Sequence, residues 1–253
     1  MTPIKSEREI GLIRESCRLV VETFKFIEKT IAEGMTTGEL NHEIDRFIRK
    51  FGGRPAFKDY KVGDKVFPAS SCISVESEVV HGIPGDRKLK VGEIVSVDVG
   101  VEYNGFFGDA AKTFAIGEID ATRRRLMQVT WEALYCGIAQ ARARKRVNDV
   151  AHAVQQCVEA AGFSVVRDLV GHGVGRHLHE EPQIPNFGKP NEGPKLKTGM
   201  VLAIEPMVNA GRPDVVTAAD EWTVVTADKQ PSAHFEHTVV IREGEAEILT
   251  QGL

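Results

Sequence analysis

The strongest constraint on the fold is an apolar stretch, residues 95–109, in which valines alternate with small and polar residues around an Asn-Gly pair at 104–105. An Asn-Gly pair between alternating segments is the strongest short-range signal for a β-hairpin. With this pair as the loop, Asp98 lies opposite Ala111, and Asp109 shares the face of Ala111 because side chains alternate along a strand. Two carboxylates therefore converge, and their burial is costly unless a cation or a proton compensates the charge. The alternative is a solvated hairpin face with two ordinary aspartates.

The composition is that of a globular protein, and it excludes several classes. The chain has 253 residues, 42% of them hydrophobic and 27% charged, and no linker divides it, so we expect one domain over residues 1–253. A net charge of −4 gives no reason to expect a nucleic-acid or membrane surface, and we interpret the basic run at 142–146 as a solvated helix end. No exposed apolar stripe predicts an obligate dimer, so we expect a monomer.

Targeting signals and cysteine usage favour a cytoplasmic protein. No apolar run approaches the ~20 residues that cross a bilayer. Residues 1–9 carry too many charges for a signal peptide. The four cysteines show no CxxC pairing, which is typical of a reduced compartment.

Apolar residues at steps of three and four predict four helices, over residues 6–34, 36–53, 122–144 and 148–162. The first two begin with capping boxes, Ser6 with Glu9 and Thr36 with Glu39, and we expect Asn148 to cap the fourth. Strand patterns lie at residues 72–75, 79–80, 165–170, 200–209, 221–226, 233–241 and 245–250. Helices grouped apart from antiparallel strands predict an α+β fold, and the repeated order of helix pair and hairpin indicates a duplicated unit.

The second half of the chain adds further candidates for a metal site. Glu205 and Glu236 each stand alone in an apolar strand pattern, and singly each is compatible with a salt-bridged strand glutamate. The segment 171–182 combines glycines with three histidines, but it matches neither a nucleotide-binding glycine motif nor HExxH. Four carboxylates and an imidazole exceed the ligand set of a structural zinc site. They suit two divalent ions about 3.5–4 Å apart with bridging carboxylates.

These residues stand in the contexts VSVDVG, GFFGDAAKTF, GHGVGRHLHEEP, LAIEPM and FEHTVV. In this order the motifs resemble those of the pita-bread metallohydrolases, and among them the type I methionine aminopeptidases, over residues 4–249. The resemblance implies a pita-bread fold, a pseudo-twofold antiparallel sheet flanked by two helix pairs. It also implies an enzyme that removes the initiator methionine from nascent polypeptides with a small second residue.

The resemblance implies a ligand set for two divalent metal ions. Asp98 would bind one ion with both oxygens, Asp109 and Glu236 would bridge, and His172 and Glu205 would complete the other site. A donor set of nitrogen and oxygen admits cobalt, manganese, iron or zinc.

The resemblance also implies the residues that contact substrate. His81 would contact the scissile amide nitrogen, His179 would hydrogen-bond the substrate carbonyl, and Glu205 would accept a proton from the attacking water. The methionine pocket would be lined by apolar or soft side chains, namely Phe67, Cys72, Leu178, Trp222 and Tyr60. Taken without the resemblance, these side chains read as ordinary core or surface residues.

Three positions depart from the family pattern. The charged loop 54–66 is longer than usual, Glu76 replaces an expected asparagine, and His177 stands where a small or charged residue is expected. The long loop leaves open an aminopeptidase of altered, Xaa-Pro type specificity. A catalytically silent relative that binds peptides or the ribosome is a further alternative, which loss of a metal ligand would indicate.

Overall fold

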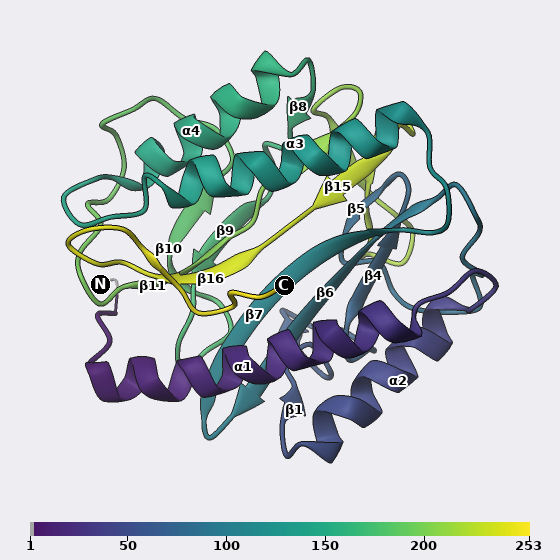
Figure 1. Ribbon diagram of the computed structural model, residues 1–253, viewed down its shortest axis with the longest axis horizontal. Helices are drawn as coiled ribbons and strands as arrows, with labels where there is room; N and C mark the ends of the chain where they lie inside the picture. Colours follow the sequence, from purple (N-terminus) through teal and green to yellow (C-terminus); the bar gives the residue numbers. More distant parts are fainter. Residues whose placement is uncertain (1–2) are drawn as a thin grey trace.

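Two helix pairs enclose a layer of strands in the computed structural model, which describes residues 3–253 (Figure 1). One pair comprises α1 (Glu7–Thr30) and α2 (Thr37–Lys50), and the other, on the opposite side, comprises α3 (Ala121–Ile138) and α4 (Val147–Ala160). This arrangement agrees with the predicted architecture. The first two residues of the charged N-terminal segment, Met1 and Thr2, lie outside the described residues.

Local capping determines where the first two helices begin. The Ser6 amide donates to Glu9 Oε2 at 3.0 Å and the Thr36 amide donates to Glu39 Oε2 at 2.8 Å, so both predicted capping boxes are confirmed. Each box satisfies backbone donors that the first helical turn leaves without a partner.

The predictions for the second helix pair were wrong at two points. Helix α3 ends at Ile138, and the basic run lies in the following loop, where Arg144 has a left-handed φ of 75°. The Leu196 amide donates to the Lys145 carbonyl at 2.8 Å and so holds this loop. The loop residues therefore hydrogen-bond to a distant segment instead of continuing helix α3. Helix α4 begins after Arg146 and not after Asn148.

The central hairpin has the predicted register. Strands β6 (Ile94–Tyr103) and β7 (Phe106–Ala115) pair Asp98 with Ala111 and Gly100 with Asp109. The loop residues at 104 and 105 have φ of 53° and 78°, the left-handed conformations that a two-residue hairpin loop requires. Strand β4 (Cys72–Val75) pairs with the other edge of β6 and sets Cys72 opposite Asp98.

Each long strand predicted in the last third is broken at its glutamate. The pattern at 200–209 is divided into β11 (Val201–Ile204) and β12 (Met207–Asn209), and that at 233–241 into β15 (Ser232–His234) and β16 (His237–Val240). The pairing of Ile204 with His237 and of Met207 with His234 keeps one register across both breaks, so Glu205 faces Glu236. Pro206 contributes to the break because it has no amide to donate to a ladder.

The two hairpins are joined at this break. The Glu236 amide donates to the Ala111 carbonyl at 2.9 Å, and Thr238 Oγ1 donates to the Asp109 carbonyl at 2.7 Å. These two hydrogen bonds attach β7 to the segment around Glu236. They therefore bring the acidic side chains of the central hairpin next to Glu205 and Glu236.

The remaining strands are short. They are β1 (Arg54–Pro55), β2 (Lys61–Val62), β3 (Lys65–Val66), β5 (Glu78–Val80), β8 (Ser164–Val165), β9 (Val170–Gly173), β10 (Glu180–Pro185), β13 (Val215–Thr217), β14 (Val224–Thr226) and β17 (Glu247–Ile248). The sequence patterns missed β10 and β13 as well as β1, β2 and β3, which lie in the stretch 54–66 that was predicted to be a loop. They also merged β8 with the start of β9. Within residues 3–253, no helix combines the length and apolarity needed to span a membrane.

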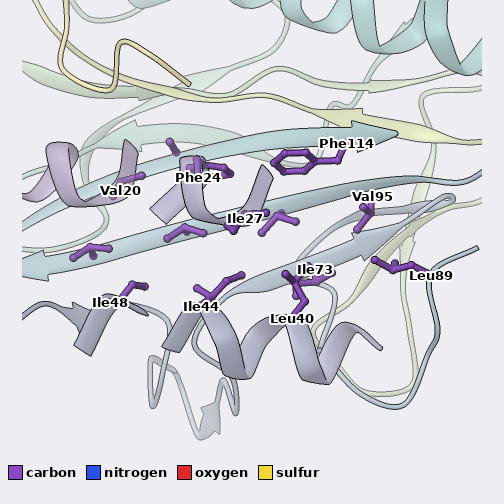
Figure 2. Packing of buried hydrophobic residues seen from close by; sticks show 14 of the residues in the cluster. Val20, Phe24, Ile27, Leu40, Ile44, Ile48, Ile73, Leu89, Val95 and Phe114 are labelled. Carbon is purple, nitrogen blue, oxygen red and sulfur yellow. The ribbon is translucent and has the colours of Figure 1, made fainter. Parts of the chain in front are cut away.

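Apolar packing fixes the helices against the strands. Figure 2 shows Phe24 of α1 and Ile44 of α2 among the buried side chains that face the central strands. Helix α1 approaches β7 closely at Gly108, where a Cβ would lie 2.6 Å from the Cys17 amide nitrogen. Closely packed protein interiors tolerate little movement of their side chains. The hairpins therefore form a rigid base for the polar residues that they carry.

Candidate active site

The five predicted metal ligands meet where the two hairpins join. Three come from strands β6, β7 and β9, and two come from the breaks between β11 and β12 and between β15 and β16. All five line one cavity of about 260 Å³, and they are Asp98, Asp109, His172, Glu205 and Glu236. His81 and His179 line the same cavity. The structure therefore brings together all seven polar residues that the motifs singled out.

The surroundings of the four carboxylates disfavour their ionised forms. Burial raises the pKa of Asp109 to about 7, and burial together with the charge of Asp109 raises the pKa of Asp98, Glu205 and Glu236. Among residues 3–253, Asp98 Oδ1, Asp109 Oδ1 and Glu236 Oε1 are buried acceptors without a hydrogen-bond partner. A cation placed among these oxygens would satisfy them and offset the repulsion.

The orientation of His172 also suits a cation. Its Nδ1 donates to the Gly173 carbonyl at 2.9 Å, so Nε2 carries the lone pair in the neutral ring. Nε2 lies 3.5 Å from Glu205 Oε1 and 3.8 Å from Asp109 Oδ2. A lone pair facing carboxylate oxygens is repulsive unless a positive ion lies between them. Burial lowers the pKa of His172 to about 4, which keeps the ring neutral and able to coordinate.

Two sets of three side chains each place their donor atoms within 4.8 Å of one another. One set is Asp109, His172 and Glu236, and the other is Glu205, His234 and Glu236. The shared Glu236 links the two sets, and the nitrogen of His172 together with the carboxylate oxygens fits divalent transition ions. His234 was missed by the sequence reasoning. Its position two residues before Glu236 was the available signal, because residues i and i+2 of a strand share a face.

A tyrosine supports the candidate histidine at the cavity mouth. The Tyr60 hydroxyl lies 2.5 Å from His179 Nδ1, and the two rings meet edge to face with centroids 5.0 Å apart. If the hydroxyl donates to Nδ1, the proton of the neutral ring lies on Nε2. Burial lowers the pKa of His81, so this second imidazole is also neutral at pH 7.

Aromatic side chains and a thiol form the apolar wall of the cavity. Phe67, Cys72, Trp222 and Tyr60 line it, and the rings of Phe67 and Trp222 meet edge to face at 5.3 Å. Leu178 is buried behind this wall and lines the neighbouring groove instead. Further apolar wall residues that the sequence reasoning missed are Phe57, Val62, Val80, Leu169, Val170 and Met207. They come from separate segments, so no local pattern marks them.

The three departures from the motif pattern have clear positions. The long loop carries Tyr60 and Val62 into the cavity wall through the β2–β3 hairpin. Glu76 accepts from the Ile94 amide at 2.8 Å and pairs with Arg123, which ties the turn between β4 and β5 to β6 and α3. His177 is exposed on the neighbouring groove.

Comparison with known proteins identifies the family. The model of metallopeptidase family M24 matches residues 11–243. The chain belongs to this family. A methionine aminopeptidase 1 of Bacillus subtilis (strain 168) is 51% identical over 247 residues, which cover 98% of both chains. The methionine aminopeptidase of Clostridium perfringens is 50% identical over 250 residues and 99% of both chains.

Solved structures support the same placement within family M24. The methionine aminopeptidase of Rickettsia prowazekii aligns with a TM-score of 0.96 and 39% identity, covering 99% of this chain and 100% of that one. The prolidase of Pyrococcus horikoshii OT3 aligns with a TM-score of 0.80 and 22% identity over 64% of its own length, a likeness of fold alone. These matches confirm the predicted family and the pita-bread architecture.

Proposed function

We propose that this protein is a metal-dependent methionine aminopeptidase that removes the N-terminal methionine from nascent polypeptides with a small second residue. The observation that carries the proposal is the single cavity that combines a carboxylate-rich base with an apolar aromatic wall. Relatives that share about half of the residues over the full chain bear the name of this activity.

The metal centre is proposed to use the five clustered ligands. Asp98, Asp109, His172, Glu205 and Glu236 would hold two divalent ions, cobalt, manganese, iron or zinc. When bound, such ions polarise a carbonyl and lower the pKa of water to near neutrality. The buried unpartnered oxygens and the lone pair of His172 support this assignment.

The side chains around the centre are proposed to orient the substrate and move its protons. Glu205 accepts a proton from the attacking water, and His81 contacts the scissile amide nitrogen. The Nε2–H group of His179 donates a hydrogen bond to the carbonyl oxygen, which gains negative charge as the tetrahedral intermediate forms. Tyr60 fixes that tautomer by donating to Nδ1.

Selection of methionine is proposed to follow from the shape of the cavity. At about 260 Å³ the cavity is smaller than sites for drug-sized ligands, which run ≈ 300–1,000 Å³, so it suits one side chain of moderate length. Burial and the nearby carboxylates raise the pKa of the Cys72 thiol well above its ordinary value, so the thiol stays neutral in the wall. We further propose that the protein is a cytoplasmic monomer of one domain and that it meets its substrates at the ribosome.

Cleavage of a short peptide panel tests the proposal. The chelated protein would be incubated with Met-Ala-Ser, Met-Leu-Ser, Leu-Ala-Ser and Ala-Pro-Ser, with and without added manganese, cobalt or iron. We expect metal-dependent release of methionine from Met-Ala-Ser and little cleavage of the other three. Preferred cleavage of Ala-Pro-Ser would instead indicate Xaa-Pro specificity. No cleavage with any metal would favour a silent binding protein.

Paired variants make the same assay specific for the site. Asp109→Asn should abolish cleavage, whereas Asp86→Asn, at an exposed aspartate that does not line the cavity, should leave it unchanged. Retained activity of the Asp109 variant would refute the assignment of that carboxylate.

A further inference from the structure

We infer that His234 is a positioning residue of the metal centre: its Nε2–H group donates a hydrogen bond to Glu205 and holds that carboxylate in place. The inference rests on the proposed metal centre and adds a residue to it. His234 ends strand β15, and its side chain is only 2% exposed. Its Nε2 lies 3.5 Å from Glu205 Oε2.

The position of His234 is fixed by its main chain. Its amide donates to Thr113 Oγ1 at 3.0 Å, and the same hydroxyl donates to its carbonyl at 2.8 Å. Its pairing with Met207 on β12 places it directly beside the break that carries Glu205. The imidazole therefore has a rigid attachment from which to orient a neighbouring side chain.

His234 Nε2 has no hydrogen-bond partner among residues 3–253, although it is buried. Buried polar atoms without partners are rare and destabilising, so a nitrogen left in this state indicates a partner that takes up its position in the functional form. Glu205 Oε2 is the acceptor within reach.

Glu205 lies between two imidazoles that present opposite chemistry. His172 Nε2, 3.5 Å from Oε1, carries a lone pair because its Nδ1 donates to the Gly173 carbonyl. A neutral His234 attracts the ionised carboxylate only if its own Nε2 carries the proton. One oxygen of Glu205 is thus held by His234, and the other is free to face a cation together with His172.

This arrangement predicts an effect on metal affinity. Loss of a group that hydrogen-bonds a metal ligand typically weakens metal binding by 10–100-fold. Gln has an amide nitrogen at a distance from the backbone similar to that of His Nε2, so His234→Gln can still donate to Glu205. His234→Ala cannot donate, and His234→Asn carries the same amide on a side chain that is one carbon shorter.

Calorimetric titration of the chelated variants with Mn²⁺ tests the inference without any peptide substrate. We expect His234→Ala and His234→Asn to bind the ion of the Glu205 site 10–100-fold more weakly than the native protein. His234→Gln should stay within about threefold, and His42→Ala, at an exposed histidine of α2, should match the native protein. In a Glu205→Gln background, His234→Ala should have no further effect.

Two results would overturn the inference. Native affinity in both the Ala and Asn variants would make His234 a bystander. Equal weakening in Gln and Ala variants would indicate that His234 coordinates the ion directly. Thermal unfolding of the chelated proteins identifies a variant that fails to fold. If His234→Ala fails to fold, the comparison of Mn²⁺ affinity between His234→Gln and His234→Asn tests the inference. If the native protein itself binds no Mn²⁺, the proposed metal centre fails, which is a separate outcome.

Discussion

The buried carboxylate cluster predicts that Asp109→Asn stabilises the metal-free protein. The folded protein holds the pKa of Asp109 at about 7, against an ordinary value of 3.8, chiefly because burial disfavours the charge. Between these two values the folded state binds a proton that the unfolded chain has released. The free energy of unfolding therefore falls as the pH rises from about 4 to about 7. Asn cannot ionise, so the variant avoids this loss.

The magnitude follows from the size of the shift. One pKa unit corresponds to about 1.4 kcal/mol, so the shift of Asp109 costs the native protein roughly 4 kcal/mol above pH 7. For a chain of this size 1 kcal/mol moves the melting temperature by about 2–4 °C. We thus expect chelated Asp109→Asn to melt on the order of 10 °C above the native protein at pH 8, and close to it at pH 4.

Thermal unfolding followed by circular dichroism, with EDTA present and across this pH range, is the assay. Asp86→Asn is the control for loss of an exposed aspartate, and it should match the native protein at every pH. Added Mn²⁺ should stabilise the native protein and leave Asp109→Asn nearly unchanged. An equal or lower melting temperature for chelated Asp109→Asn at pH 8 would show that Asp109 does not carry the electrostatic cost.

Three further substitutions test separate parts of the structure. His179→Ala should lower kcat for Met-Ala-Ser by roughly 10²–10³, as expected for an oxyanion donor, and an unchanged kcat would exclude that role. Tyr60→Phe removes the hydroxyl that meets His179 Nδ1, so steady-state kinetics should show kcat lowered by about fivefold with little change in KM. A rise in KM alone would limit Tyr60 to the pocket wall. Gly108→Ala would set a Cβ 2.6 Å from the Cys17 amide nitrogen and should destabilise the fold by about 1–3 kcal/mol in denaturant unfolding. Native stability would refute the close approach of α1 to β7.

Features encoded by adjacent residues could be predicted from the sequence. The Asn-Gly loop determines the register of the central hairpin, and through that register it places Asp98 and Asp109 near one another. Both capping boxes were found for the same reason, since the residues that satisfy the first helical turn lie within it. The five proposed ligands stand in contiguous motifs, so the sequence could also indicate that they share a site, and the structure places them in one cavity.

Features that depend on distant partners could not be predicted. The strand breaks at Glu205 and Glu236 arise where the chain leaves one sheet for the other, and an apolar run does not reveal such a crossing. The end of α3 depends on a loop that pairs with Leu196. The position of Leu178 behind the cavity wall and the buried nitrogen of His234 likewise follow from tertiary packing. The assignment of residues 1–253 to one domain stays a prediction.

The most direct test of the proposed metal-dependent activity is a titration of the chelated protein with Mn²⁺ or Co²⁺ while free methionine released from Met-Ala-Ser is measured. The ligand cluster predicts no release without metal and a rate that rises until the ions fill the site and then stays constant. Full-rate release in the presence of excess chelator, or no release from protein shown to have bound its metal, would contradict the proposed function.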